Sequence, residues 1–140
     1  LRTFLSGEMI AALSQNTILS KSIDLSIADF DGEALLSGYD CVRELGINRA
    51  LFHTRIMDNI LKKTPKELYS FFLGAILCEE AETLAECKNQ IYIYDKKNIR
   101  KSMIYLLKHR LSLSVSEISD SYSEFAAAIG AVKIFEYEGD

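Results

Sequence analysis

The residues best suited to chemistry lie near the start of the chain, where Ser6, Gly7 and Glu8 precede an apolar helical segment. A small residue, a glycine and an acid at a helix start can present backbone N–H groups to an anion and a carboxylate to sugar hydroxyls. The same three residues can equally form an ordinary helix cap, with Ser6 as the capping side chain. The pattern therefore leaves two interpretations open, a ligand-binding turn and a plain cap.

Other catalytic patterns are absent from the sequence. It contains no GxxxxGK[ST] phosphate loop, no GxGxxG turn and no Ser/His/Asp grouping. His53 and His109 lie far apart, and each is more simply explained as an ordinary histidine on a helix. Cys41, Cys78 and Cys87 form no CxxC or Cys/His pair, so we expect buried thiols and no metal site.

Basic side chains are concentrated in the segment 96–110. They could attract an anionic ligand, but a solvated helix face is the simpler interpretation. The residues are Lys96, Lys97, Arg100, Lys101, Lys108 and Arg110.

The composition is that of a soluble globular protein. The 140 residues are 49% hydrophobic and 26% charged, which fits one domain spanning residues 1–140. The net charge of −4 argues against a nucleic-acid partner, since such proteins usually carry a basic surface. No apolar run is long enough to span a membrane, and the first residues do not resemble a signal peptide, so we expect a cytoplasmic protein without a membrane partner.

Apolar periodicity predicts a mostly helical chain. Thr64, Pro65 and Glu67 form the clearest start signal, a capping box with proline at the first helical position. The segment 68–78 that follows is apolar almost all round, which indicates a central, buried helix. Gly46 should end the preceding helix, and Asn48 should cap the next one. The expected helices span residues 7–16, 26–45, 48–62, 65–88 and 98–110, and the inner face of the third is expected to carry Leu51, Phe52, Ile56 and Ile60.

Two short segments have the character of strands. Residues 91–94 and 113–118 flank the helix 98–110, which predicts a parallel pair with a right-handed crossover. Parallel sheets are normally buried on both faces, and two strands alone are marginally stable. We therefore expect missing sheet partners and an exposed apolar edge, hence self-association or pairing with another part of a parent chain. A last helix is predicted beyond residue 121, with Phe125, Ile129, Val132 and Phe135 on one face, although 132–137 could be a strand.

Longer stretches of the sequence resemble the 2-keto-3-deoxygalactonate kinases. The run from Thr3 to Leu19 is similar to a family segment that reads roughly F-x-T-G-E-x-x-x-x-L-x-x-x-[ST]-I-L. The run from Arg49 to Arg55 resembles the family's L-F-x-x-R helix, and the run from Leu73 to Glu80 resembles its G-L-L-I-G-A-E helix. The closing order of strands and helices is similar as well, so the likeness runs through nearly the whole chain but covers only the C-terminal half of the family.

The resemblance implies an α/β fold, the mostly helical C-terminal lobe of a two-lobed, actin-like (RNase-H-like) sugar kinase with a short, incomplete parallel sheet. It implies transfer of the ATP γ-phosphoryl to the terminal hydroxyl of a six-carbon 2-keto-3-deoxy acid, with Mg²⁺ bridging the phosphates. Carried over, the turn of Ser6, Gly7 and Glu8 would bind substrate. The nucleotide-binding residues would be Gly74, Glu80 and Tyr94.

The sequence departs from the family pattern on the nucleotide side. Cys78 stands where the family has a second glycine, and Tyr94-Asp95-Lys96 stands where it has Gly-Ser-Pro. Two alternatives therefore stay open beside a kinase whose isolated C-terminal part is inactive. One is a diverged domain of the same fold that binds a sugar acid or nucleotide without turnover, and the other is a helical interaction module. The sequence does not identify the sugar acid, the catalytic base or the metal ligands.

Overall fold

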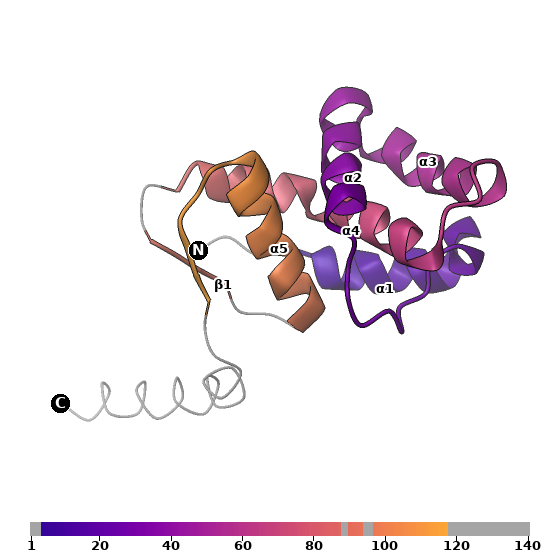
Figure 1. Cartoon of the computed structure of the whole chain (residues 1–140), viewed down its shortest axis with the longest axis horizontal. Helices are drawn as coiled ribbons and strands as arrows, with labels where there is room; N and C mark the ends of the chain where they lie inside the picture. Colours follow the sequence, from indigo (N-terminus) through magenta and orange to yellow (C-terminus); the bar gives the residue numbers. More distant parts are fainter. Residues whose placement is uncertain (1–3, 88–89, 94–96, 118–140) are drawn as a thin grey trace.

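The computed structural model describes residues 4–87, 90–93 and 97–117. These ranges form a mostly helical α/β arrangement in which helices surround a central helix and a short sheet lies at one end (Figure 1). The elements are α1 (Ser6–Asn16), the 3₁₀ helix η1 (Ile18–Lys21), α2 (Gly32–Leu45), α3 (Ile47–Asn59), α4 (Pro65–Ala85), β1 (Ile91–Ile93), α5 (Lys97–Arg110) and β2 (Val115–Glu117).

Helix α4 is the centre of the core, as its apolar sequence predicts. Every residue from Leu68 to Cys78 is buried, because α2, α3, α5 and α1 all pack against this helix. Helices α2 and α4 approach closely where each carries a glycine. A Cβ on Gly38 would lie 2.0 Å from the Phe71 carbonyl oxygen, and a Cβ on Gly74 would lie 1.9 Å from that of Leu35. Glycine is therefore required at both positions by the packing of the helices.

The predicted capping box at the start of α4 is confirmed. The Thr64 hydroxyl accepts a hydrogen bond from the Glu67 backbone N–H at 3.3 Å, and the Glu67 carboxylate accepts one from the Thr64 N–H at 2.9 Å. Lys63 Nζ also donates to Glu67 Oε1 at 2.7 Å. Hydrogen bonding by Lys63 and then by Thr64 lowers the pKa of Glu67 to about 2. These contacts fix the position at which the central helix begins.

The helix predicted over 26–45 begins later than expected. Helix α2 starts at Gly32, because Asp31 caps it by accepting a hydrogen bond from the Ala34 N–H at 2.8 Å. Gly46 ends α2 with a φ of 83°, the positive value that the sequence predicts for a glycine there. The same glycine is the N-cap of α3, so Asn48 lies inside that helix and the prediction that it caps α3 was wrong.

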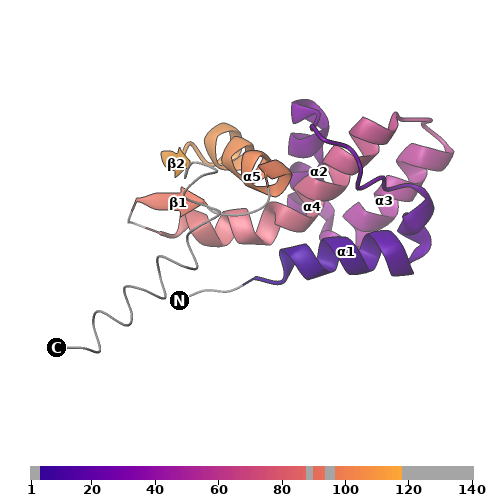
Figure 2. The ribbon, with the colours of Figure 1, turned by 90° about the horizontal axis from the view of Figure 1, so that it is seen from below.

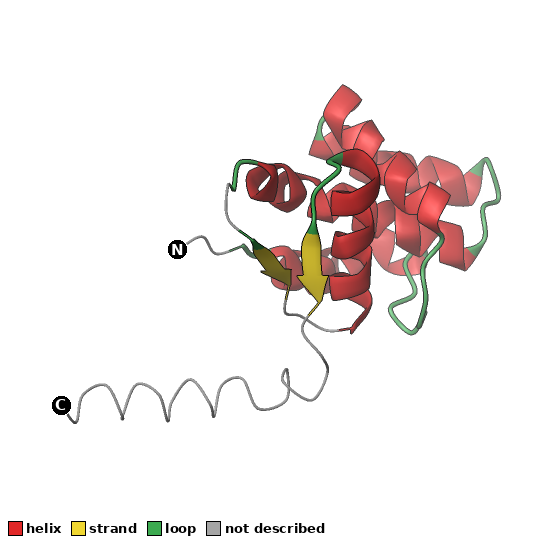
Figure 3. Ribbon diagram, turned by 60° about the vertical axis from the view of Figure 1, so that its left-hand side comes forward, coloured by secondary structure: helices red, strands yellow, loops and turns green. Residues whose placement is uncertain are grey.

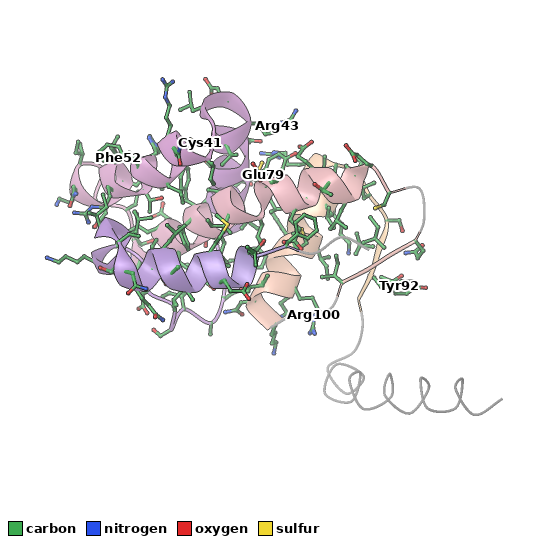
Figure 4. All side chains as sticks on the ribbon, turned by 180° about the vertical axis from the view of Figure 1, so that it is seen from behind. Cys41, Arg43, Phe52, Glu79, Tyr92 and Arg100 are labelled. Atoms are coloured by element: carbon green, nitrogen blue, oxygen red, sulfur yellow. The ribbon has the colours of Figure 1, made fainter. Side chains whose placement is uncertain are left out.

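The predicted inner face of α3 is confirmed in part, since Leu51 is half-buried and packs against the core. Its buried residues are Ala50, Thr54 and Met57, whereas Phe52 is 59% exposed and Ile60 is 71% exposed. The prediction is therefore wrong for Phe52 and Ile60, which lie on the exposed side. Figure 4 labels Phe52 on this helix.

Strands β1 and β2 form the predicted parallel pair, with Ile91 opposite Val115 (Figure 3). No further strand joins them within the described ranges, and Tyr92 on β1 is 64% exposed. Helix α5 connects the strands and buries Met103 and Leu106 as predicted. The end of the first expected strand at residue 94, the end of the second at 118 and the predicted final helix lie outside the described residues.

The basic segment is only partly a solvated face. Lys97, Lys101, Lys108 and Arg110 are exposed, but Arg100 on α5 is 3% exposed, which corrects the expectation for that residue. Arg110 forms a two-bond ion pair with Asp40 of α2, at 2.9 and 2.7 Å. Among the described residues, no helix combines the length and the apolar character needed to cross a membrane.

Candidate functional site

A cavity that includes predicted site residues lies where the start of α1 meets α4 and the start of α5. Its volume is about 660 Å³, within the range typical of small-molecule sites. Figures 2 and 4 show α1 running along the side of the helical body. The lining residues are Gly7, Glu8, Ile10, Ala11, Leu25, Tyr69, Lys97, Asn98 and Ile99.

Ser6 does not cap α1, contrary to one of the two interpretations of its sequence. It is the first residue of the helix, and Leu5 at the N-cap provides no side-chain hydrogen bond. The Ser6 hydroxyl instead donates to Glu80 Oε2 of α4 at 2.6 Å. This bond joins residues 74 positions apart and fixes the first turn of α1 against the central helix.

Gly7 and Glu8 both face the cavity. A Cβ built on Gly7 would meet no atom within 4 Å, so the space beside this glycine is open. Glu8 is exposed, and its carboxylate forms no ion pair within the described part of the chain. Two of the three residues predicted to bind substrate therefore line one cavity, and the third holds their helix in place.

The opposite wall comes from the start of α5 and from α4. Lys97 is the first residue of α5 and, like Glu8, has no ion-pair partner among the described residues. Asn98 Nδ2 donates to the Ile27 carbonyl at 2.9 Å, and its side chain also hydrogen-bonds Tyr69. Burial raises the pKa of Tyr69, so its phenol stays neutral near pH 7. The cavity is thus lined by the Glu8 carboxylate, the Lys97 ammonium and the Asn98 amide, together with apolar side chains.

Gly74 and Glu80, two of the three residues predicted to bind a nucleotide, both lie on α4 and make contacts within the protein. Gly74 lies inside the α2–α4 crossing and is absent from the cavity lining. The Glu80 carboxylate accepts a hydrogen bond from Ser6, a residue that the family resemblance assigned to the sugar-acid substrate. Tyr94 lies outside the described residues. Sequence reasoning also missed Tyr69, Asn98 and the other lining residues from outside α1, which are adjacent only in the folded chain; the start of the basic segment at Lys97 was the one available signal.

A second, shallower cavity of about 460 Å³ lies between α2 and α4. Arg43 and Glu82 form an ion pair across it at 2.8 Å, and Tyr39 also donates to Glu82. Cys78 faces this cavity, and burial raises the pKa of its thiol to about 11 (Figure 4 labels Arg43). These charges already satisfy one another, so the first cavity is the better candidate.

The histidines and cysteines add no catalytic group. The ring of His53 packs against Phe71 with centroids 5.6 Å apart, and that of His109 stacks on Tyr105 at 4.1 Å. Cys78 is buried, but Cys41 is half-buried and Cys87 is exposed, so the expectation of three buried thiols is confirmed only for Cys78. Within the described ranges, no cluster of His, Cys, Asp and Glu could hold a metal ion.

Comparison with known protein families shows which family the chain belongs to. A family profile described as 2-keto-3-deoxy-galactonokinase matches residues 1–124 of the chain. The chain belongs to this family. No curated protein and no solved structure matches the chain. The resemblance that the sequence indicated is thereby confirmed, and the chain is related to sugar kinases.

The motifs that carried the resemblance to 2-keto-3-deoxy-galactonokinases have structural roles here. Arg55, from the L-F-x-x-R segment, donates to the Ser22 hydroxyl at 2.7 Å and pairs with Asp58 at 3.2 Å. The Ser22 hydroxyl in turn donates to Asp58 at 2.6 Å, which joins the segment after η1 to α3. The G-L-L-I-G-A-E-like segment forms the buried part of α4 around Gly74. The first motif, by contrast, reaches the cavity.

Proposed function

We propose that this chain is the C-terminal part of a cytoplasmic kinase that transfers the ATP γ-phosphoryl to the terminal hydroxyl of a 2-keto-3-deoxy sugar acid, such as 2-keto-3-deoxygalactonate. Membership of the 2-keto-3-deoxy-galactonokinase family supports the reaction class. The observation that carries the assignment of a site is the cavity between α1 and α5, with Glu8 and Lys97 among its lining residues.

The cavity offers complementary groups for a hydroxylated anion. The Glu8 carboxylate can accept hydrogen bonds from sugar hydroxyls, and the Lys97 ammonium can attract a carboxylate. Neither side chain has an ion-pair partner within the described ranges, so no described ion pair would have to break for a ligand to bind. Ser6, Gly7 and Glu8 are accordingly proposed as the sugar-acid side of the site, with Ser6 acting through its bond to Glu80.

The remaining parts of the reaction are assigned to the parent protein. Phosphoryl transfer depends mainly on positioning and on charge stabilisation by Mg²⁺ and basic groups around ATP. The proposed nucleotide side comprises Gly74, Glu80 and Tyr94, in a two-lobed, actin-like enzyme. Because the sequence has no phosphate-binding loop, we expect the isolated chain to bind ligand without turnover. The two-stranded sheet supports pairing with further strands, from the rest of the parent or from a second copy.

Calorimetric titration of the 140-residue chain tests this proposal. 2-Keto-3-deoxygalactonate and Mg²⁺-ADP are titrated separately, so that a sugar-acid site is distinguished from a nucleotide site. Lys97→Ala and Glu8→Gln should each weaken sugar-acid binding about tenfold, as expected for loss of a hydrogen bond to a charged group. Lys108→Ala is the matched control, because Lys108 is exposed on the last turn of α5 and does not line the cavity.

The outcomes separate the alternatives clearly. Saturable sugar-acid binding that depends on Lys97 and Glu8, but not on Lys108, supports the proposed site. Binding of Mg²⁺-ADP alone would assign the cavity to the nucleotide. An absence of binding for both ligands would contradict the proposed site and leave the chain as a helical interaction module.

A further inference from the structure

Most glycines of the described ranges are explained by the fold. A Cβ on Gly32 would lie 2.4 Å from the Tyr105 hydroxyl, and one on Gly38 or Gly74 would collide with backbone carbonyl oxygens. Gly46 has a φ of 83°, which side chains rarely adopt. At Gly38, Gly74 and Gly46 the backbone accounts for glycine, whereas at Gly32 a Cβ would only displace the end of the Tyr105 side chain.

Gly7 is the exception among the described glycines. It lies in the first turn of α1, its φ is not positive, and a Cβ there would meet nothing within 4 Å. Neither backbone conformation nor packing therefore requires glycine at this position. Glycine is also a poorer helix former than alanine, so the residue slightly disfavours the helix in which it stands. The open space beside it belongs to the cavity that Glu8, Lys97 and Asn98 also line.

We infer that Gly7 is a specificity-determining residue, whose missing side chain leaves room for the ligand against the first turn of α1. This inference rests on the proposed function of the cavity and deepens it. The ligand would pack its hydroxylated, negatively charged part on the bare backbone at Gly7, between Glu8 and Lys97. A methyl group at position 7 would stand where the ligand does, although it disturbs no atom of the protein.

The test transfers the glycine of α1 from position 7 to position 12. Gly7→Ala should raise Tm by about 1–4 °C through helix propensity, yet weaken binding of 2-keto-3-deoxygalactonate about tenfold or more. Ala12→Gly is the control, since Ala12 is exposed on α1 and does not line the cavity. It should lower Tm by a similar amount without altering binding. The double variant Gly7→Ala/Ala12→Gly keeps the original composition and should have nearly the original Tm while binding stays weak.

Binding by calorimetry and Tm by thermal unfolding are measured on the 140-residue chain for all four proteins, with Mg²⁺-ADP as a second ligand. Loss of affinity in both proteins that carry Ala at position 7, without loss of stability, supports the inference, and the ligand affected identifies which one contacts Gly7. Unchanged binding of both ligands by Gly7→Ala would overturn the inference while leaving the proposed site intact. Failure of the unmodified chain to bind either ligand would overturn the proposed site and the inference together.

Discussion

Replacing Gly74 by alanine should destabilise the protein strongly, because of the close approach of α2 and α4. The new Cβ would lie 1.9 Å from the Leu35 carbonyl oxygen, whereas ordinary contact begins at 3.4 Å. The two helices would have to separate locally by about 1.5 Å, the difference between these distances. The clashing atom belongs to the backbone, so rotation of a side chain cannot relieve the contact.

The expected loss follows from the packing around this crossing. Overpacking a core typically costs about 1–3 kcal/mol, and a gap of about 0.5–1 Å already forfeits a quarter to a half of each dispersion contact. Leu35, Phe72 and Leu73 are completely buried beside the crossing, so separation of α2 from α4 loosens large side chains. We expect Gly74→Ala to lower the free energy of unfolding by about 3 kcal/mol or more, and Tm by about 10 °C.

Urea unfolding followed by circular dichroism measures this loss, with Gly7→Ala as the matched control. The same change is made in both variants, but the Cβ at position 7 enters open space. A Gly74→Ala protein with unchanged stability would refute the packing argument. If that protein also failed to bind Mg²⁺-ADP, the nucleotide role that family resemblance assigns to Gly74 would explain the glycine instead.

Three further predictions concern single contacts. Removing the bond between Ser6 and Glu80 by Ser6→Ala, Glu80→Gln and the double variant should give a coupling energy of about 1–2 kcal/mol in unfolding, and additive effects would show that the bond contributes nothing. Hydrogen bonds from a lysine ammonium and a threonine lower the pKa of Glu67 to about 2, so its stabilising contribution should be present above pH 4.5 and disappear as pH falls toward 2. Glu67→Gln should abolish that part of the pH dependence of Tm, and an unchanged profile would contradict it. A thiol reagent at pH 8 should modify the exposed Cys87 rapidly and the buried Cys78 only on unfolding, as mass spectrometry of digested protein can show.

Local signals in the sequence predicted those features that depend on neighbouring residues. The capping box of Thr64 and Glu67 set the start of α4, and the apolar segment 68–78 predicted its burial. The parallel pairing of β1 with β2 followed from the order of strand, helix and strand. Each of these patterns is completed within about thirty residues, so no distant contact was needed to recognise it.

Features decided by distant contacts could not be predicted in the same way. Phe52 on α3 and Ile60 at its C-cap are as apolar as core residues, but the helix buries Ala50, Thr54 and Met57 and leaves these two exposed. The apolar character of these side chains does not indicate which face of the helix will be buried.

The candidate site also combines residues that the sequence could indicate with residues brought in by distant contacts. The sequence named glycine and glutamate at positions 7 and 8 as candidates for a ligand-binding turn, and both line the cavity. The partner of Ser6 lies 74 residues away, and the opposite wall of the cavity comes from Tyr69 and Asn98. The sequence does not distinguish a serine that caps a helix from a serine that donates a hydrogen bond to a distant carboxylate, because both need only a serine at a helix start.

Binding of a sugar acid in the cavity between α1 and α5 can be measured by a nuclear magnetic resonance titration of the ¹⁵N-labelled chain with 2-keto-3-deoxygalactonate. Saturable shifts should be concentrated on the backbone amides of Gly7 and Glu8 and on those of Lys97 and Asn98 across the cavity. Amides on the exposed side of α3 should not move. Shifts confined to other parts of the chain, or no saturable shift at any accessible concentration, would contradict binding in this cavity.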